Sequence, residues 1–313
     1  MDSRAATFVG CFFLGIAASA FAADLVPGVT VEAERQRTQL RHDVDAFVAS
    51  SIVLAHTDDQ TIERWTYKPI CPMVAGLTQQ QGEFVLGRIS KIAAQAGAPL
   101  ASTKCRSPNL FVIVTSDPAS LIKKLESTRS AFNREMSARQ KTDFERDRPV
   151  RTWYNAGTVS LDGTLVIEML DTSSSRARNG SDRNGQTPVF NNMPSQYGSR
   201  LNASTVTHDI LSVIEIVDRR STVGLNMNQL ADYVAVAGLA QVDLDKDLGS
   251  APTILNVFRA PADAKASGAT SWDIALLTAL YKADRSKTMA LSEIQGMVLA
   301  SVSQGPRSEK VTP

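Results

Sequence analysis

The sequence predicts an α+β fold, and three observations support this. Unbroken apolar runs at 110–114 and 210–217 are typical of buried strands. Apolar residues recur at helical spacing over 79–96, shortly before the first of these strands. Strands and helices alternate in the first part of the chain and helices dominate the last third, which indicates a mixed sheet with helices packed on it.

Local patterns predict the individual elements as well. Up to residue 118 they are a helix over 38–54, a strand over 64–70, a helix over 79–96 ended by Gly97 and Pro99, a strand over 110–114, and a helix begun by Ser116-Asp117-Pro118. A solvated helix face over 134–151, strands over 150–154 and 165–170, and an exposed loop over 171–202 follow. The last part has a strand over 210–217 and helices near 226–239, 252–258, 272–283 and 290–302. The loop over 171–202 is poor in apolar residues, which predicts a flexible or functional segment.

The opening residues predict a secretory signal peptide over 1–22. Arg4 precedes an uncharged apolar stretch, and Ala20-Phe21-Ala22 offers the small-x-small pattern that signal peptidase cleaves. An uncleaved anchor is the alternative, because the stretch is close to the roughly 17 residues that a spanning helix needs. A lipoprotein site at Cys11 is a weaker alternative, since little apolar sequence precedes it. We expect a periplasmic or secreted protein with no membrane span after cleavage.

Composition narrows the range of partners. The hydrophobic share of 43% can form a core, and the net charge of +1 offers no electrostatic footprint for nucleic acid or an anionic membrane surface. We therefore expect no nucleic-acid partner. The chain contains no glycine-rich phosphate loop, G-x-S-x-G elbow or Cys-x-x-Cys pair, so we expect no cofactor.

Two cysteines, Cys71 and Cys105, remain after the predicted cleavage. Cysteines in an oxidising compartment usually pair, so we expect a disulfide, which the chain-entropy model values at roughly 3.5–4 kcal/mol. A nucleophilic thiol is the alternative, but no histidine pattern accompanies either cysteine.

The helix predicted over 226–239 has the most specific pattern. The zincin metallopeptidase motif, His-Glu-x-x-His-x-x-Gly-x-x-His, brings three histidines to one zinc, and its glutamate activates the zinc-bound water. Aligned on Gly238, the ligand positions fall on Ala231, Ala235 and Gln241, and the glutamate position falls on Asp232. Alanine has no donor atom, so this helix cannot hold zinc in that way, and we expect no metal.

A second segment strengthens the comparison. Residues 271–281, Ser-Trp-Asp-Ile-Ala-Leu-Leu-Thr-Ala-Leu-Tyr, resemble the C-terminal helix of metzincin-type peptidases. The chain over 62–284 thus resembles a degenerate zincin, and it also resembles an uncharacterised group of proteobacterial exported proteins. The resemblance implies a zincin-like domain with a substrate-sized cleft over 62–284, preceded by a helical or extended segment over 23–61 and followed by a helix and tail over 285–313. It carries over no activity, because the ligands and a clear methionine turn are absent.

We therefore predict an exported, non-catalytic protein that binds a peptide, a protein or an envelope component. The binding surface is the cleft that the zincin resemblance implies, or the loop over 171–202. One alternative is a hydrolase with an unrecognised site, in which Asp232 acts with another carboxylate or a histidine. Asp232 has an ordinary interpretation too, as a surface or capping carboxylate. A purely structural envelope protein is the third possibility. The histidines, His42, His56 and His208, are scattered and suggest no site.

Overall fold

The computed structural model describes residues 27–54, 62–102, 105–127, 138–160, 165–166, 206–284 and 290–304. The chain divides into two compact units, Met1–Gln39 and Leu40–Pro313, and the boundary falls inside helix α1 (Pro27–Ser51). The predicted signal peptide and the loop over 171–202 lie outside the described residues. The fold that follows is that of the second unit.

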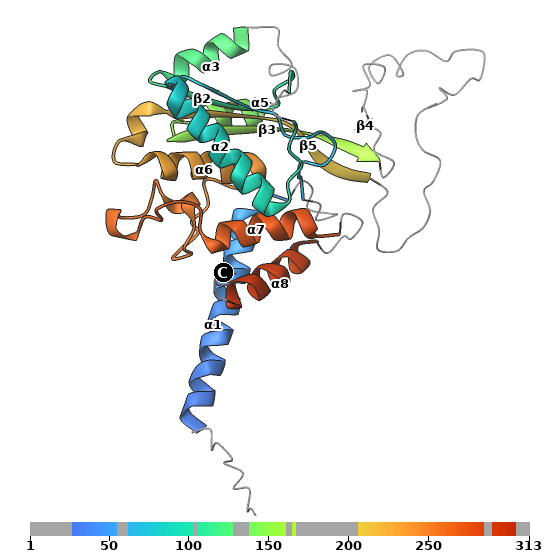
Figure 1. The fold of residues 1–313 in the computed structure, drawn as a ribbon, viewed down its shortest axis with the longest axis vertical. Coiled ribbons are helices and arrows are strands. Elements are labelled where there is room, and N and C mark those ends of the chain that lie inside the picture. The colour runs from blue at the N-terminus through green and yellow to red at the C-terminus, as the bar shows by residue number, and fades with distance from the viewer. Residues whose placement is uncertain are drawn as a thin grey trace, which may run out of the picture. The chain divides into compact units, whose positions relative to one another are not determined.

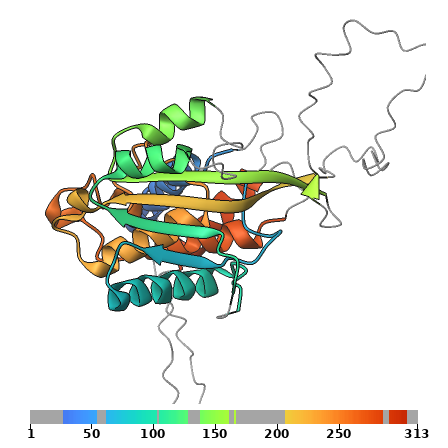
Figure 2. The ribbon, with the colours of Figure 1, turned by 90° about the horizontal axis from the view of Figure 1, so that it is seen from above.

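A five-stranded mixed sheet is the centre of this unit (Figures 1 and 2). Its strands are β1 (Pro72–Ala75), β2 (Leu110–Thr115), β3 (Val150–Ser160), β4 (Leu165–Val166) and β5 (Val206–Asp218). Their order is β1-β2-β5-β3-β4, in which β1, β2 and β5 are parallel and β3 runs antiparallel to both of its neighbours. The predicted α+β class is confirmed.

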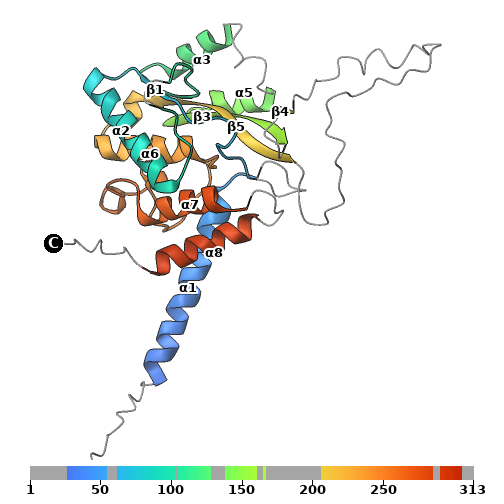
Figure 3. The ribbon, with the colours of Figure 1, turned by 45° about the vertical axis from the view of Figure 1, so that its right-hand side comes forward.

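Helices cover both faces of the sheet. The larger core joins one face to α2 (Gln79–Ala96), α6 (Met227–Leu239), α7 (Ser271–Lys282) and α8 (Ala290–Ser303). Helices α3 (Pro118–Ser127) and α5 (Ala138–Glu145) cover part of the opposite face, where a small core contains Ile122, Phe144, Trp153 and Ile216. Figure 3 shows α7 and α8 side by side below α6. Three short 3-10 helices complete the described elements: η1 (Arg219–Thr222), η2 (Ile254–Asn256) and η3 (Ala262–Ala264).

Sequence-local signals set the ends of several helices. Thr78 caps α2 in a capping box with Gln81, and Gly97 ends the helix in the left-handed conformation at φ 77°. Asn226 and Gln229 form the same box at α6, and Thr270 and Asp273 form it at α7. These helices begin within one residue of the predicted positions because the signals that start them lie in the adjacent sequence.

Several predicted elements differ from the structure. The helix predicted near 252–258 is only the 3-10 helix η2, and the helix face predicted over 134–151 overlaps the start of strand β3 at Val150. The strand predicted over 64–70 is wrong: this segment forms only isolated bridges, Arg64 with Asp209 and Ile70 with Leu100. Its apolar side chains are anchored by tertiary contacts, as when the Trp65 indole donates to the Gly238 carbonyl oxygen at 2.9 Å. The helix predicted over 38–54 instead begins at Pro27 and ends at Ser51.

The predicted disulfide is confirmed. Cys71 and Cys105 are bonded, with their Cα atoms 6.0 Å apart, so the residue before β1 is joined to the loop before β2. The side chain of Asn109 supports the same junction, because it accepts from the Cys71 amide at 2.7 Å and donates to the Pro69 carbonyl at 3.1 Å. Within the described residues, no helix combines the length and apolar character needed to cross a membrane.

Candidate functional site

The candidate site helix α6 is buried on every side from Gln229 to Leu239. Ala231 and Ala235, the two aligned ligand positions on the helix, are fully buried in the larger core. Gly238 approaches β2 closely, since a Cβ atom there would lie 2.8 Å from Leu110 Cδ1. The small residues therefore let α6 pack tightly against the sheet and its neighbouring helices.

Asp232 is a buried partner in an ion pair. Arg88 of α2 donates from Nε to Oδ1 at 2.6 Å and from Nη2 to Oδ2 at 2.5 Å, and the Ala269 amide donates to Oδ2 at 2.7 Å. Its carboxylate is completely buried, whereas the Arg88 side chain is 26% exposed. A Cβ at Gly268 would lie 2.6 Å from Oδ2, so this glycine leaves room for the pair. These contacts hold α6 against α2. Asp232 is therefore neither the surface carboxylate nor the capping carboxylate of the ordinary interpretation.

Three aromatic side chains fix the C-terminal end of α6. Tyr154 Oη donates to the Ala237 carbonyl at 2.7 Å, Trp65 Nε1 donates to the Gly238 carbonyl at 2.9 Å, and Tyr281 Oη donates to the Leu239 carbonyl at 2.6 Å. The last carbonyl groups of a helix have no partner within it, so these side chains satisfy groups that would otherwise be orphaned. The position at which residues 241–245 begin is therefore fixed by these hydrogen bonds.

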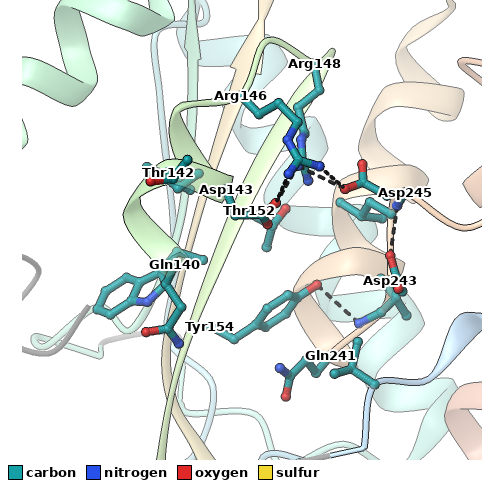
Figure 4. A pocket seen from close by; sticks show the side chains of 15 residues that line it. Gln140, Thr142, Asp143, Arg146, Arg148, Thr152, Tyr154, Gln241, Asp243 and Asp245 are labelled. Atoms are coloured by element: carbon teal, nitrogen blue, oxygen red, sulfur yellow. Dashed lines mark hydrogen bonds and ion pairs between the residues drawn. The ribbon is translucent and has the colours of Figure 1, made fainter. Parts of the chain in front are cut away.

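A cleft of about 710 Å³ lies between β3 and the segment after α6 (Figure 4). One wall comes from the region of α5 and β3, and the other comes from the five consecutive residues 241–245. The cleft is lined by Val53, Gln140, Thr142, Asp143, Phe144, Arg146, Arg148, Thr152, Trp153, Tyr154, Gln241, Val242, Asp243, Leu244 and Asp245. Of the residues singled out from the zincin comparison, Gln241 lines this cleft, whereas Ala231, Asp232 and Ala235 do not.

The cleft follows the edge of strand β3. Thr152, Trp153 and Tyr154 all line it. Successive side chains of a strand point to opposite faces, so a cleft lined by three in a row runs along the strand's edge. Among the described residues, β4 covers this edge only at Thr158 and Val159.

The backbone of β3 presents polar groups to that edge. Asp218 N donates to Pro149 O at 2.9 Å across the β3–β5 pair. Hydrogen-bonded and non-hydrogen-bonded pairs alternate along an antiparallel ladder, so the pairs of Thr152 with Glu215 and Tyr154 with Val213 are of the second kind. Thr152 and Tyr154 therefore direct their backbone N–H and C=O groups away from β5 and towards the cleft.

An ion-pair network bridges one end of the cleft, as Figure 4 shows. Arg148 Nη2 lies 3.1 Å from Asp143 Oδ1 and 3.0 Å from Asp245 Oδ2. Arg146 pairs with the same two carboxylates at 3.2 and 3.4 Å. The network joins the two walls, and its balanced charges make this end polar without a net sign.

Buried polar atoms without partners gather beside the cleft. Within the described residues, Thr152 Oγ1, Gln241 Oε1, Arg148 Nε and both carboxylate oxygens of Glu215 are buried and lack a hydrogen-bond partner. Glu215 is completely buried and lies directly across from Thr152, on the same face of the sheet. Native proteins leave few such atoms unsatisfied, so their concentration here makes this region the candidate binding site.

Burial controls the ionisation of the acidic groups in this region. It raises the pKa of Glu215 well above the usual range of a carboxyl group, because desolvation disfavours the charged form. Burial also raises the pKa of Tyr154, and the nearby carboxyl groups of Glu215 and Glu63 raise it further. The pKa of Glu63 itself is raised by burial to about 7.

Sequence reasoning identified Gln241 but missed Thr152, Tyr154, Glu63 and Glu215. One available signal was Glu215, the single charged residue within the apolar run over 210–217. His42 lies exposed on α1, 3.6 Å from its neighbour Asp43, and His208 lies in β5, whereas His56 is outside the described residues.

In the described part of the chain, no three histidine, cysteine, aspartate or glutamate side chains group closely enough to hold a metal ion. Comparison of the chain with known protein families, with curated proteins and with solved structures found no match.

Proposed function

We propose that this chain is an exported binding protein, without peptidase activity, whose cleft takes an extended peptide segment of another protein. The observation that carries the proposal is the course of the cleft along the edge of β3, where Thr152 and Tyr154 present backbone donors and acceptors. An extended peptide can add to such an edge as a further strand, with main-chain hydrogen bonds supplying affinity.

The residues of α6 support a binding role over a zinc peptidase role. Ala231 and Ala235 offer no donor atoms at the positions where the zincin motif has ligands, and they are packed in the core. Asp232, at the position of the catalytic glutamate, is occupied by Arg88 and the Ala269 amide. A mixed sheet followed by this helix is the order of elements that a degenerate zincin fold would have.

Export is supported by two separate observations. The predicted signal peptide over 1–22 directs secretion, and the disulfide between Cys71 and Cys105 forms in oxidising compartments. We expect the full chain, expressed in a Gram-negative host, to be recovered from the periplasm with its N-terminus at Ala23. Mass spectrometry of the intact protein checks this, and recovery of the unprocessed chain in the cytoplasm would contradict it.

The binding proposal is tested with a displayed library of unstructured peptides. Peptides selected on the processed protein should lose at least tenfold in affinity for Thr152→Pro, which removes the outward amide without removing a hydrogen bond to β5. The same loss is expected for Gln241→Trp, which fills the cleft from the opposite wall. Gln79→Trp, on the exposed first turn of α2, is the matched control and should bind like the natural chain.

The readout is the dissociation constant measured by fluorescence polarisation, with thermal melting used to show that each variant is folded. If the selected peptides bound the natural chain and both cleft variants with equal affinity, the cleft would not be their binding site. Hydrolysis of labelled casein by the natural chain would show instead that the protein is an enzyme.

A metal-independent hydrolase is the second candidate, and one observation favours it. Two carboxyl groups of perturbed pKa, those of Glu63 and Glu215, both act on the hydroxyl of Tyr154. A carboxyl group with a pKa near 7 suits general acid–base catalysis. If the casein assay shows turnover, Glu63→Gln should abolish it; unchanged turnover would exclude this assignment.

A further inference from the structure

The oxygen atoms beside the cleft that lack hydrogen-bond partners indicate which kind of ligand group could bind there. Thr152 contributes a hydroxyl, Glu215 contributes two carboxyl oxygens, and Gln241 contributes an amide oxygen from the opposite wall. Acceptor capacity dominates this set, so a group that carries several donors is its natural complement.

Among these residues, Thr152 and Glu215 are direct neighbours on adjacent strands. Thr152 lines the cleft, and Glu215 faces it across the β3–β5 ladder in a pair of the closely spaced kind. Cβ atoms in such pairs are roughly 4.5–5.5 Å apart. A charge held at the Thr152 hydroxyl would therefore lie close to the Glu215 carboxyl, in surroundings from which water is excluded.

The neighbours of Glu215 leave this acid without a counter-ion in the described structure. Val112 is its partner on β2, while Tyr154 of β3 and Tyr233 of α6 are the titratable groups that interact with it. Burial and the Glu215 carboxyl raise the pKa of both phenols, so they remain neutral. The cations of the cleft, Arg146 and Arg148, are paired with Asp143 and Asp245.

We propose that Thr152 and Glu215 form a subsite that selects peptides with a cationic side chain, lysine or arginine, at the position facing Thr152. This inference rests on the proposed function, because it assumes that the cleft binds an extended peptide. The cation donates to the Thr152 hydroxyl, and the Glu215 carboxyl, which lies behind it, ionises and releases one proton. Opposite charges at this separation stabilise each other strongly where solvent is excluded.

The test compares two capped peptides of alternating threonine and valine that differ at the centre. One has lysine and the other has norleucine, which has a similar chain but no charge. The natural chain should bind the lysine peptide at least tenfold more tightly. Glu215→Gln, a nearly isosteric and neutral variant, should abolish this preference, so that it binds the two peptides with equal affinity.

Titration calorimetry in buffers of different ionisation enthalpy supplies an independent readout. Binding of the lysine peptide should release protons from the natural chain and none from Glu215→Gln. Thr152→Val, which keeps the shape and removes the hydroxyl, should weaken lysine binding in the same way and serves if Glu215→Gln does not fold.

The outcomes separate the two proposals. Equal affinity for the two peptides overturns the subsite and leaves the binding cleft in place. No binding of either peptide, together with no selection from the library, overturns the proposed function and the subsite with it. A lysine preference that persists in Glu215→Gln and Thr152→Val places the selecting group elsewhere and overturns the subsite.

Discussion

Asp232 illustrates how the environment of a single residue decides its role. Two guanidinium donors and a backbone amide engage its oxygens, and its side chain has no exposed surface. The hydrogen bonds to Asp232 are the first cause of the raised pKa of Arg88, which keeps the guanidinium charged. A carboxylate held in this way stabilises the junction of α2 and α6 and is poorly placed to exchange protons with a substrate.

Asp232→Asn should therefore reduce stability and leave peptide binding unchanged. The substitution keeps the side-chain shape but leaves Arg88 without its counter-ion, and we expect a loss of about 2–3 kcal/mol, reduced from the fully buried case because Arg88 is partly exposed. Urea unfolding followed by circular dichroism measures the change. Asp263→Asn, on the exposed η3, is the control. An unfolding free energy equal to that of the natural chain would show that the ion pair contributes nothing.

Only part of the candidate site could be predicted from the sequence. Gln241 was identified by its place after a glycine in one helix, and Cys71 and Cys105 were identified by their number and compartment. Thr152 and Glu215 lie more than sixty positions apart and meet only because β3 pairs with β5 in one register. A lone glutamate in an apolar strand is a candidate site residue, but its neighbour across the sheet is fixed by strand pairing that no local sequence pattern encodes.

At the scale of the element, α6 depends on close packing at Gly238. A methyl group there would lie 2.8 Å from Leu110 Cδ1 and 3.2 Å from Cδ2, and Leu110 is itself fully buried. Gly238 lies inside the helix, one residue before its end. The structure thus gives Gly238 a packing role between α6 and β2.

Gly238→Ala and Gly87→Ala should have opposite effects on stability. Alanine at 238 must push Leu110 aside in a packed core, at a cost of about 1–3 kcal/mol. Alanine at 87 meets nothing within 4 Å in the interior of α2 and should gain about 0.5–1 kcal/mol from helix propensity. Chemical denaturation of the two variants is the measurement. Equal shifts would refute the packing role.

The elements themselves were predictable where their signals are local. Helix α2 was predicted with its observed bounds because its apolar spacing lies within the segment and Gly97 follows it directly. The strand predicted over 64–70 failed for the opposite reason. Aromatic and β-branched residues suit any half-buried extended chain, and here Trp65 is held by α6 instead of by a strand partner.

For the whole molecule, acidic groups buried near the cleft make stability depend on pH. Burial raises the pKa of Glu63 from 4.5 to about 7, so between these values the folded chain binds a proton that the unfolded chain releases. The free energy of unfolding therefore falls as pH rises through this window. Glu215 acts in the same direction, because burial raises the pKa of its carboxyl group too.

Glu63→Gln should remove the part of this pH dependence that lies between pH 4.5 and 7. The natural chain should lose about 2–3 kcal/mol more than the variant across that range. Urea titrations at half-unit intervals of pH give the two curves, and Glu83→Gln on the exposed face of α2 provides the control. Parallel curves for the natural chain and Glu63→Gln would contradict the raised pKa.

The class of the fold could be predicted, but the order of its strands could not. Alternating helices and strands indicated a mixed sheet, and the structure has one. The residues of β2, β3 and β5 contain no pattern that predicts the position of β5 between β2 and β3. That order follows from which side chains pack beneath which helix, a property of the assembled core.

The central place of β5 also affects how the chain reaches its native state. Leu110 of β2 pairs with Val213 about a hundred positions later, and β3 pairs with the same strand. Contacts between distant segments carry a large entropic cost before they gain any stabilisation, and they slow folding. The full sheet cannot assemble until β5 has been synthesised, so the earlier strands wait for the last one before they close the core. The disulfide ties the residue before β1 to the loop before β2 and so shortens the search that remains.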